Sequence, residues 1–334
     1  MRTKYSILTV LAAILASGSF AQQLPQFSQY MQNMYVLNPA ASCLESDIDI
    51  NLGYRQQWAG FDGAPQTYYL SGSVNLGKQP EQSGASYSIP ISHRSLLQTR
   101  EEIRKAKHVV GGLVAVDEYG LFKRTSVMAS YSYHHPISDK YWISVGTSMG
   151  WYGLNFGADN VILENPTDNT YGDFIANGNR SNLFDINAGL FIYSDRLFLG
   201  YSVYQIAQNE INLGNESSPV NLSQAKLNIH HFATLGYSIP VADKVDITPS
   251  VMVKLLGPAP VSYDLNLRAE FNRKFWLGVS YRNEDAISGL AGLRVNDWLR
   301  FGYAYDFITS DINNLSSGSH ELVLGIQLDR KNER

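Results

Sequence analysis

The chain has 334 residues, of which 44% are hydrophobic, 17% are charged and 12% are aromatic. Its plentiful aromatic residues and its formal net charge of -4 exclude an intrinsically disordered chain, and its mean hydropathy of -0.18 excludes a bundle of membrane helices. With 26 basic against 30 acidic side chains, a large nucleic-acid-binding surface is also excluded, so we expect no nucleic-acid partner.

Residues 1–21 have the three parts of a secretory signal peptide. A positive start precedes an apolar stretch from Ile7 to Ala16, and small residues stand before the predicted cleavage after Ala21. The apolar stretch is shorter than the ~20 residues that cross a bilayer as a helix, so a membrane anchor is the weaker interpretation. We therefore predict that the chain is exported and that its mature form begins at Gln22.

From residue 46 onwards, the dominant period of the sequence is two. Between Val261 and Phe271 every second residue is apolar, and the residues between are polar or charged. A strand with this pattern has one face in an apolar medium and the other in a wet one. Similar segments predict about fourteen strands, near residues 46–58, 64–77, 108–117, 122–135, 140–155, 183–194, 196–206, 227–239, 244–255, 260–272, 274–282, 285–295, 297–309 and 318–329.

This strand pattern is typical of outer-membrane barrels. An even number of strands suits antiparallel closure, which leaves no unpaired edge in lipid. The alternative is a secreted β-sandwich, whose apolar faces meet each other instead of lipid. Aromatic residues near strand ends and full charges on the polar faces favour the barrel. We predict an all-β fold, a transmembrane antiparallel β-barrel over residues 46–330, located in the outer membrane with the lipid bilayer around it.

Three connections between the predicted strands are long. Segments 157–182 and 207–226 are rich in small polar residues and follow the barrel rule of long extracellular loops, if the N-terminus lies in the periplasm. Segment 78–107 then lies on the periplasmic side and carries charges of both signs. It is either a solvated loop or a docking surface for a periplasmic protein.

The sequence lacks a convincing catalytic motif. Ser148 lies in a G-x-S-x-G match, but the match sits inside an alternating strand and no helix follows, so we predict a small lumen-facing residue. Each of the pairs His134–His135 and His230–His231 points to opposite faces of a strand, so neither pair chelates one metal. We predict no catalytic residue, no cofactor and no metal, and we expect that the protein is not an enzyme; an outer-membrane lipase is a distant alternative.

Several stretches of the mature chain resemble one protein family. They are residues 26–31 (QFSQYM), 37–40 (LNPA), 54–65 (YRQQWAGFDGAP), 231–237 (HFATLGY), 249–251 (PSV), 276–282 (WLGVSYR), 303–306 (YAYD) and 318–322 (GSHEL). Together they are similar to the PorP/SprF family, outer-membrane proteins of the type IX secretion system. Two departures stand out: the family's N-P-A-Y-A-G ends here in Ala41-Ser42-Cys43, and segment 79–107 is longer than expected.

The resemblance implies a barrel similar to fatty-acid transporters, with an N-terminal segment that folds into or against the lumen. Residues 22–45 agree with this, because they lack strand alternation and are rich in Gln, Asn and aromatic residues that can fill a pore by hydrogen bonding. We therefore predict that residues 22–45 plug or cap the lumen.

The resemblance also implies a function, which is to export or surface-anchor cargo proteins with a C-terminal secretion signal, gliding adhesins among them. The implied partners are the secreted cargo and other type IX secretion components, periplasmic ones included. The alternative function is a passive channel for small apolar solutes, with residues 22–45 as a hatch.

The stretch 54–65 is the predicted site. Alternation places Arg55 and Gln57 on the inward face of the first strand, and Tyr54 and Trp58 on the outward face. The turn glycines favour a structural role over direct contact with cargo. The candidate residues for partner or cargo contact are Arg55, Gln56, Gln57, Trp58, Gly60, Phe61, Asp62, Gly63, Ala64 and Pro65.

Overall fold

The computed structural model describes residues 24–77, 105–157, 179–211, 225–257, 259–314 and 316–329. The predicted signal peptide therefore lies outside the described residues. So do nearly all of segment 78–107 and most of the long connections 157–182 and 207–226.

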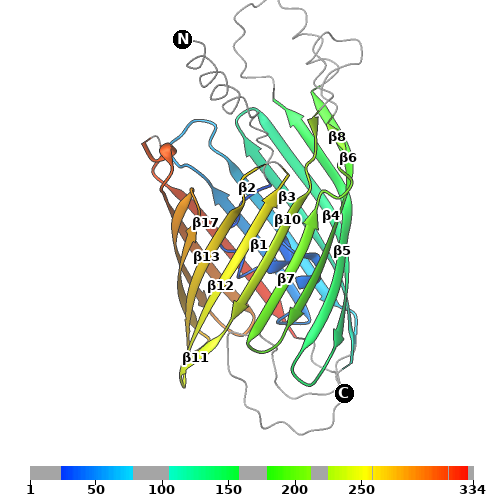
Figure 1. Cartoon of the computed structure of the whole chain (residues 1–334), viewed down its shortest axis with the longest axis vertical. Coiled ribbons are helices and arrows are strands. Elements are labelled where there is room, and N and C mark those ends of the chain that lie inside the picture. Colours follow the sequence, from blue (N-terminus) through cyan, green and yellow to red (C-terminus); the bar gives the residue numbers. More distant parts are fainter. Residues whose placement is uncertain are drawn as a thin grey trace, which may run out of the picture.

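The described residues form one antiparallel barrel (Figure 1). Its strands are β1 (Ile48–Gln56), β2 (Gln66–Asn75), β3 (Lys107–Tyr119), β4 (Phe122–Pro136), β5 (Trp142–Phe156), β6 (Arg180–Tyr193), β7 (Leu197–Tyr204), β10 (His230–Tyr237) with β11 (Ile239–Ala242), β12 (Val245–Leu256), β13 (Ser262–Phe271), β14 (Phe275–Arg282), β15 (Ala286–Arg294), β16 (Leu299–Ile308) and β17 (Ser319–Leu328).

The barrel is closed because every edge is paired. Strand β1 pairs with both β2 and β17, and β10 pairs with both β7 and β12. Strands β10 and β11 occupy one position in the wall, since both pair with β12 and only Ser238 separates them. Counted in this way the barrel has fourteen strands, and the predicted fold is confirmed. The predicted strand 227–239 corresponds to β10, and β11 extends the wall beyond its predicted end to Ala242.

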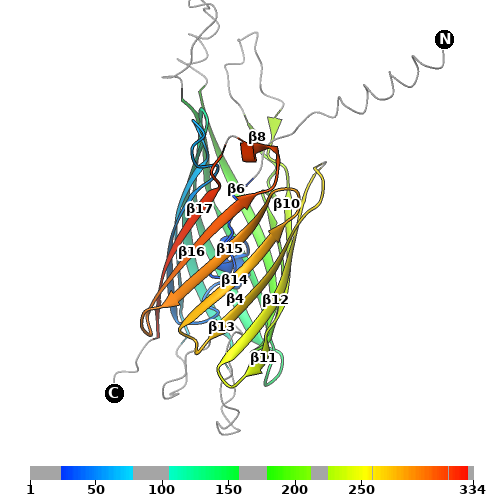
Figure 2. The ribbon, with the colours of Figure 1, turned by 90° about the vertical axis from the view of Figure 1, so that its left-hand side faces the viewer.

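We name the two ends of the barrel by their place in Figures 1 and 2. The upper end carries the β1–β2 turn, the short helical turn η3 (Asp311–Asn314) and the separate hairpin of β8 (Glu210–Ile211) and β9 (Ala225–Lys226). The lower end carries β11 and the turns 137–141, 194–196, 272–274 and 295–298.

Burial follows the alternation of the sequence. In β13 the side chains of Asp264 and Arg268 are buried inside the barrel, whereas Leu265 and Leu267 between them are each 48% exposed on its outside. An outward apolar face and an inward polar face are what a wall surrounded by lipid requires. Among the described residues, no helix is long and apolar enough to span a membrane.

Residues 24–47, which we call the inner segment, run inside the barrel from its upper end to its lower end (Figures 1 and 2). The segment has two 3-10 turns, η1 (Met34–Val36) and η2 (Pro39–Ala41). The side chain of Asn38 caps η2 by accepting a hydrogen bond of 2.9 Å from the Ala40 N–H. From Phe27 to Leu44 every residue is buried.

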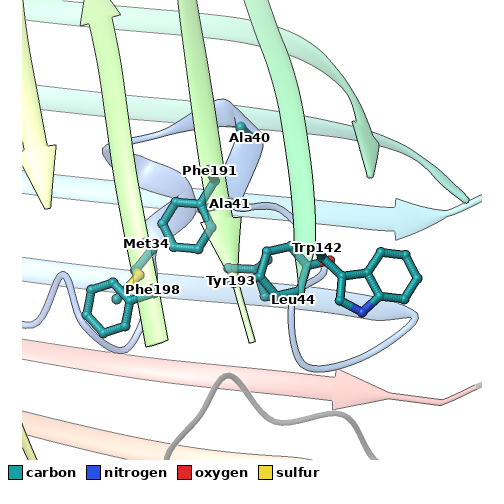
Figure 3. Packing of buried hydrophobic residues seen from close by; sticks show 8 residues of the cluster. All are labelled: Met34, Ala40, Ala41, Leu44, Trp142, Phe191, Tyr193 and Phe198. Atoms are coloured by element: carbon teal, nitrogen blue, oxygen red, sulfur yellow. The ribbon is translucent and has the colours of Figure 1, made fainter. Parts of the chain in front are cut away.

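The inner segment packs tightly against the inner wall. Figure 3 shows Met34, η2 and Leu44 against the aromatic side chains of β5, β6 and β7. The backbone of η2 reaches the wall at Gly146 of β5, where a Cβ atom would lie 2.5 Å from the Ala40 nitrogen. Only glycine allows so close an approach. The contacts place the segment inside the barrel; that it plugs or caps the lumen stays a prediction.

Candidate functional site

The inner segment is held at the upper end of the barrel by a buried ionic cluster around Ser28. The Ser28 hydroxyl donates a hydrogen bond of 2.9 Å to Asp306 and accepts bonds from Arg55, at 2.9 Å, and Arg282, at 3.1 Å. The backbone N–H groups of Ser28 and Gln29 donate to the carboxylate of Glu321, at 2.6 and 3.1 Å. We call Ser28, Arg55, Arg282, Asp306 and Glu321 the Ser28 cluster.

Ion pairs link the charged members of this cluster to one another. Arg55 lies 2.7 Å from Asp306 and 3.0 Å from Glu321, with side-chain exposures of 3% or less for all three. Because buried charges are costly unless they are paired and hydrogen-bonded, this geometry fixes one arrangement of the wall and the inner segment. The Ser28 hydroxyl and the backbone N–H groups of residues 28 and 29 add hydrogen bonds to these wall charges.

Arg282 extends the cluster along the upper wall. Its Nη1 donates hydrogen bonds of 3.0 Å to Asp285 and to Gln26 of the inner segment, and its Nε lies 3.5 Å from Asp264. Asp264 in turn lies 3.1 Å from the Lys254 ammonium group. Through Gln26 and Ser28, the inner segment is therefore bonded to four strands, which are β1, β14, β16 and β17.

The candidate stretch 54–65 divides into an inward residue and a turn. Arg55 is buried and belongs to the Ser28 cluster, as its predicted inward face requires. Strand β1 ends at Gln56, which is half-buried and accepts a bond of 3.4 Å from the Tyr54 hydroxyl. Gln57, predicted to face inward, lies beyond the strand and is also half-buried; its N–H bonds the Pro65 carbonyl at 2.8 Å.

The rest of the stretch forms the β1–β2 turn, which is fastened on both sides. The Trp58 N–H donates to the Ser319 hydroxyl at 3.1 Å, and the Gly63 carbonyl accepts from the Gly120 N–H at 2.9 Å. Gly60 and Gly63 have φ angles of +91° and +72°, the left-handed region that glycine adopts most readily. Within the turn, the Ala64 N–H bonds the Phe61 carbonyl at 3.1 Å. Phe61 and Asp62 are exposed at the tip, and are the members most accessible to a partner.

A cavity that we call the upper chamber lies beside the start of the inner segment. Its empty volume, including the solvent space at its mouth, is about 840 Å³. Leu24, Phe27 and Leu37 line it with apolar surface, and the ion pair of Arg124 and Asp117, at 2.7 Å, lies in its wall. Ser148 also lines the chamber, where its hydroxyl accepts a bond of 3.0 Å from the Asn187 amide. An amide is not a general base, so this pair does not activate a serine.

Two titratable side chains of the inner segment have pKa values raised by burial. Burial raises the pKa of the Cys43 thiol to about 12, although a bond of 3.2 Å to the Ser73 hydroxyl opposes the shift. Burial likewise raises the pKa of Tyr30, whose hydroxyl accepts a bond of 2.7 Å from Asn266. Deprotonation of either group is disfavoured while the segment remains in place.

Comparison with known families decides the identity of the fold. The family model described as type IX secretion system membrane protein PorP/SprF matches residues 19–326. The chain belongs to the PorP/SprF family. A search of curated proteins found no match.

Several solved structures are similar to this PorP/SprF protein. The CymD monoaromatic hydrocarbon channel has 12% identity and a TM-score of 0.51, over 92% of this chain and 94% of that one. The P. putida toluene transporter TodX has 8% identity and a TM-score of 0.48, over 88% and 93%. A Pseudomonas aeruginosa FadL homologue has 11% identity and a TM-score of 0.46, over 86% and 91%. At 12% identity, the likeness to CymD shows the barrel fold alone.

In this PorP/SprF protein, the Ser28 cluster joins stretches that are far apart in the sequence. Each of its five members comes from a different family-like stretch: 26–31, 54–65, 276–282, 303–306 and 318–322. Sequence reasoning selected only Arg55 and missed the other four. The sequence signal that could have identified the cluster is a charged residue on the polar face of its strand. Such a residue lies at or near one end of each of the four stretches 54–65, 276–282, 303–306 and 318–322.

The pair His134–His135 of the PorP/SprF barrel is divided between the two faces of the wall. His134 is buried, with its ring 3.0 Å from the Tyr193 hydroxyl and 3.0 Å from the Ser132 hydroxyl, whereas its neighbour His135 is exposed on the outside. In the described ranges, no three His, Cys, Asp or Glu side chains come together in a way that suits a metal ion.

Proposed function

We propose that this protein is an outer-membrane component of the type IX secretion system that helps export or surface-anchor cargo proteins carrying a C-terminal secretion signal, gliding adhesins among them. The family match over residues 19–326 is the observation that carries the proposal. The proposed partners are the cargo and other components of the secretion system, periplasmic ones included.

The position of the inner segment supports a role in assembly or anchoring. The segment contacts strands on all sides of the lumen, and its upper part is bonded to buried charges. We propose that it plugs the barrel, so that folded cargo does not pass through this chain alone. On this proposal the exposed tip of the β1–β2 turn, Phe61 and Asp62, offers a contact for cargo or a partner at the upper end.

Three accompanying proposals concern processing, location and chemistry. The chain is cleaved after Ala21, the mature barrel resides in the outer membrane, and it is not an enzyme. The bonding of Ser148 to the Asn187 amide, without a base in that contact, supports the last of these. N-terminal sequencing of the protein from isolated outer membranes tests the first two together, because both the start at Gln22 and the membrane fraction are read from one sample.

Deletion of the gene followed by complementation tests the secretion role. Cargo with the C-terminal signal is measured in the culture supernatant and on the cell surface. We expect at least one cargo to be lost on deletion and restored by the wild-type gene. The control Lys123→Gln, which removes an exposed ion pair at the upper end, is expected to restore it as well. Unchanged secretion of every signal-bearing cargo in the deletion strain would refute the proposal.

The second candidate function is a passive channel for small apolar solutes. The apolar lining of the upper chamber by Leu24, Phe27 and Leu37 favours it. Uptake of toluene into liposomes containing the purified protein distinguishes the two functions. A channel accelerates uptake without any other protein, whereas a secretion component leaves uptake at the level of protein-free liposomes and co-purifies with partners from detergent-solubilised membranes.

A further inference from the structure

A second cavity, which we call the lower chamber, opens at the lower end of the barrel. Its empty volume is about 450 Å³, including solvent at the mouth. Its lining is strongly basic, with five cationic side chains against the carboxylates of Glu45 and Glu270; the cations are Arg268, Arg273, Lys274, Arg294 and Arg300. Asp49, outside the lining, also binds Arg300, at 3.2 Å, and the chamber with this residue still has an excess of positive charge.

Hydrogen-bond donors of the lower chamber are left without a partner. Within the described ranges, neither the Nε of Arg268, nor that of Arg300, nor the side-chain amide of Gln32 makes a hydrogen bond, although these residues are only 9%, 8% and 7% exposed. Arg268 and Arg300 use their other nitrogens for Glu270, at 3.1 Å, and Glu45, at 3.1 Å. Buried donors that lack a partner are costly, and these three belong to residues that line the chamber.

The mouth of the chamber lies beside apolar side chains on the outer face of the wall. Arg273 and Lys274 are exposed in the β13–β14 turn, and no ion pair of theirs occurs in the described part of the chain. Phe275 and Leu293 are paired across β14 and β15 beside this turn, and 43% and 48% of their surfaces are exposed on the outer face. Exposed cations next to outward apolar side chains are the arrangement that receives an anionic headgroup while its acyl chains remain in the bilayer.

We propose that the lower chamber binds the phosphate group of an anionic phospholipid from the leaflet that surrounds this end of the barrel. Arg273 and Lys274 attract the headgroup at the mouth, and the guanidinium groups of Arg268, Arg294 and Arg300 supply the positive charge that faces the phosphate oxygens inside. Arg268 is held in place by Trp276, whose ring centroid lies 4.3 Å from the guanidinium carbon. This inference does not depend on the proposed role in secretion.

A titration with short-chain lipids tests the proposal. Dihexanoyl phosphatidylglycerol, dihexanoyl phosphatidylcholine or inorganic phosphate is added to the full chain folded in an uncharged detergent, and tryptophan fluorescence is followed, because Trp276 contacts Arg268. We expect saturable binding of the phosphatidylglycerol that is at least about tenfold tighter than binding of the other two probes. Equal binding of the two lipids would overturn the proposal. Tighter binding of inorganic phosphate than of either lipid would show that the chamber binds free phosphate and not a lipid headgroup, and would also overturn it.

Two double variants separate the chamber from general charge at the lower end. Arg273→Gln with Lys274→Gln removes the exposed cations at the mouth, and we expect affinity for phosphatidylglycerol to fall roughly tenfold or more. Lys140→Gln with Arg196→Gln removes two cations from other turns of the same end and is expected to leave affinity unchanged. Equal losses in both variants would overturn the assignment to the chamber. All four residues lie in turns, so we expect both variants to fold. The difference in gel mobility between unheated and heated samples verifies that each barrel is folded.

Discussion

Arg55 is expected to stabilise the barrel through the Ser28 cluster rather than through the turn that follows it. Replacing it with Gln removes ion pairs of 2.7 Å to Asp306 and 3.0 Å to Glu321, and the bond of 2.9 Å to Ser28. Removal of one partner from a buried ion pair costs about 3–5 kcal/mol. Arg282, 3.8 Å from Asp306, still compensates that carboxylate, so we expect a loss near the lower limit, about 3 kcal/mol.

The free energy of unfolding is measured with guanidinium chloride in detergent micelles, with tryptophan fluorescence as the signal. Lys123→Gln is the matched control, because its ion pair with Glu118 at 2.8 Å has side-chain exposures of 52% and 46% and is worth at most about 1 kcal/mol. Adding Glu321→Gln to Arg55→Gln should recover part of the loss, since it removes the carboxylate left uncompensated. If Arg55→Gln costs no more than the control, the cluster does not hold the structure together as argued.

Three further predictions concern the inner segment and the turn. Cys43 of the folded wild type should resist maleimide at mildly alkaline pH and react after denaturation. Burial raises the pKa of its thiol to about 12, and only the thiolate reacts. Rapid labelling of the folded barrel would contradict this. Gly146→Val should speed the labelling of Cys43, because the added side chain displaces η2. The control Gly289→Val should not, because a Cβ atom at that position meets nothing within 4 Å. Equal labelling rates in the two variants would show that the contact between η2 and the wall is unimportant. Gly63→Ala should lower the free energy of unfolding by about 1–2 kcal/mol, because φ is +72° there, and an unchanged unfolding midpoint would argue against strain.

The wall of this barrel was predictable because its period is short-range. Alternation in β13 alone predicts which side chains face inward, and Asp264, Arg268 and Glu270 are indeed buried there. The division between β10 and β11 was not predictable, because the alternation of outward apolar and inward residues continues without a break across Ser238. The register shift between Pro240 and Ala242 depends on pairing with β12, which is a property of the assembled sheet.

The candidate site was only partly predictable for the same physical reason. The inward direction of Arg55 follows from its place in the alternation, and the turn character of residues 57–65 follows from its glycines. The partners of Arg55 do not follow, because Asp306 and Glu321 are more than 250 residues away and meet it only when β1 closes on β17. The Ser28 hydroxyl adds a third stretch that no local pattern connects to the others.

The sequence by itself determined the class of the fold, the number of wall positions and the face on which each charge lies, because a strand in lipid must alternate. Only the tertiary structure decided which charges become neighbours. Closure of the barrel sets the register of the strands, and the inner segment contacts strands on all sides of the lumen. The low charged fraction of the chain has the same origin. The outer face of a barrel excludes charge, so the charges of the wall are gathered inside it and at its two ends.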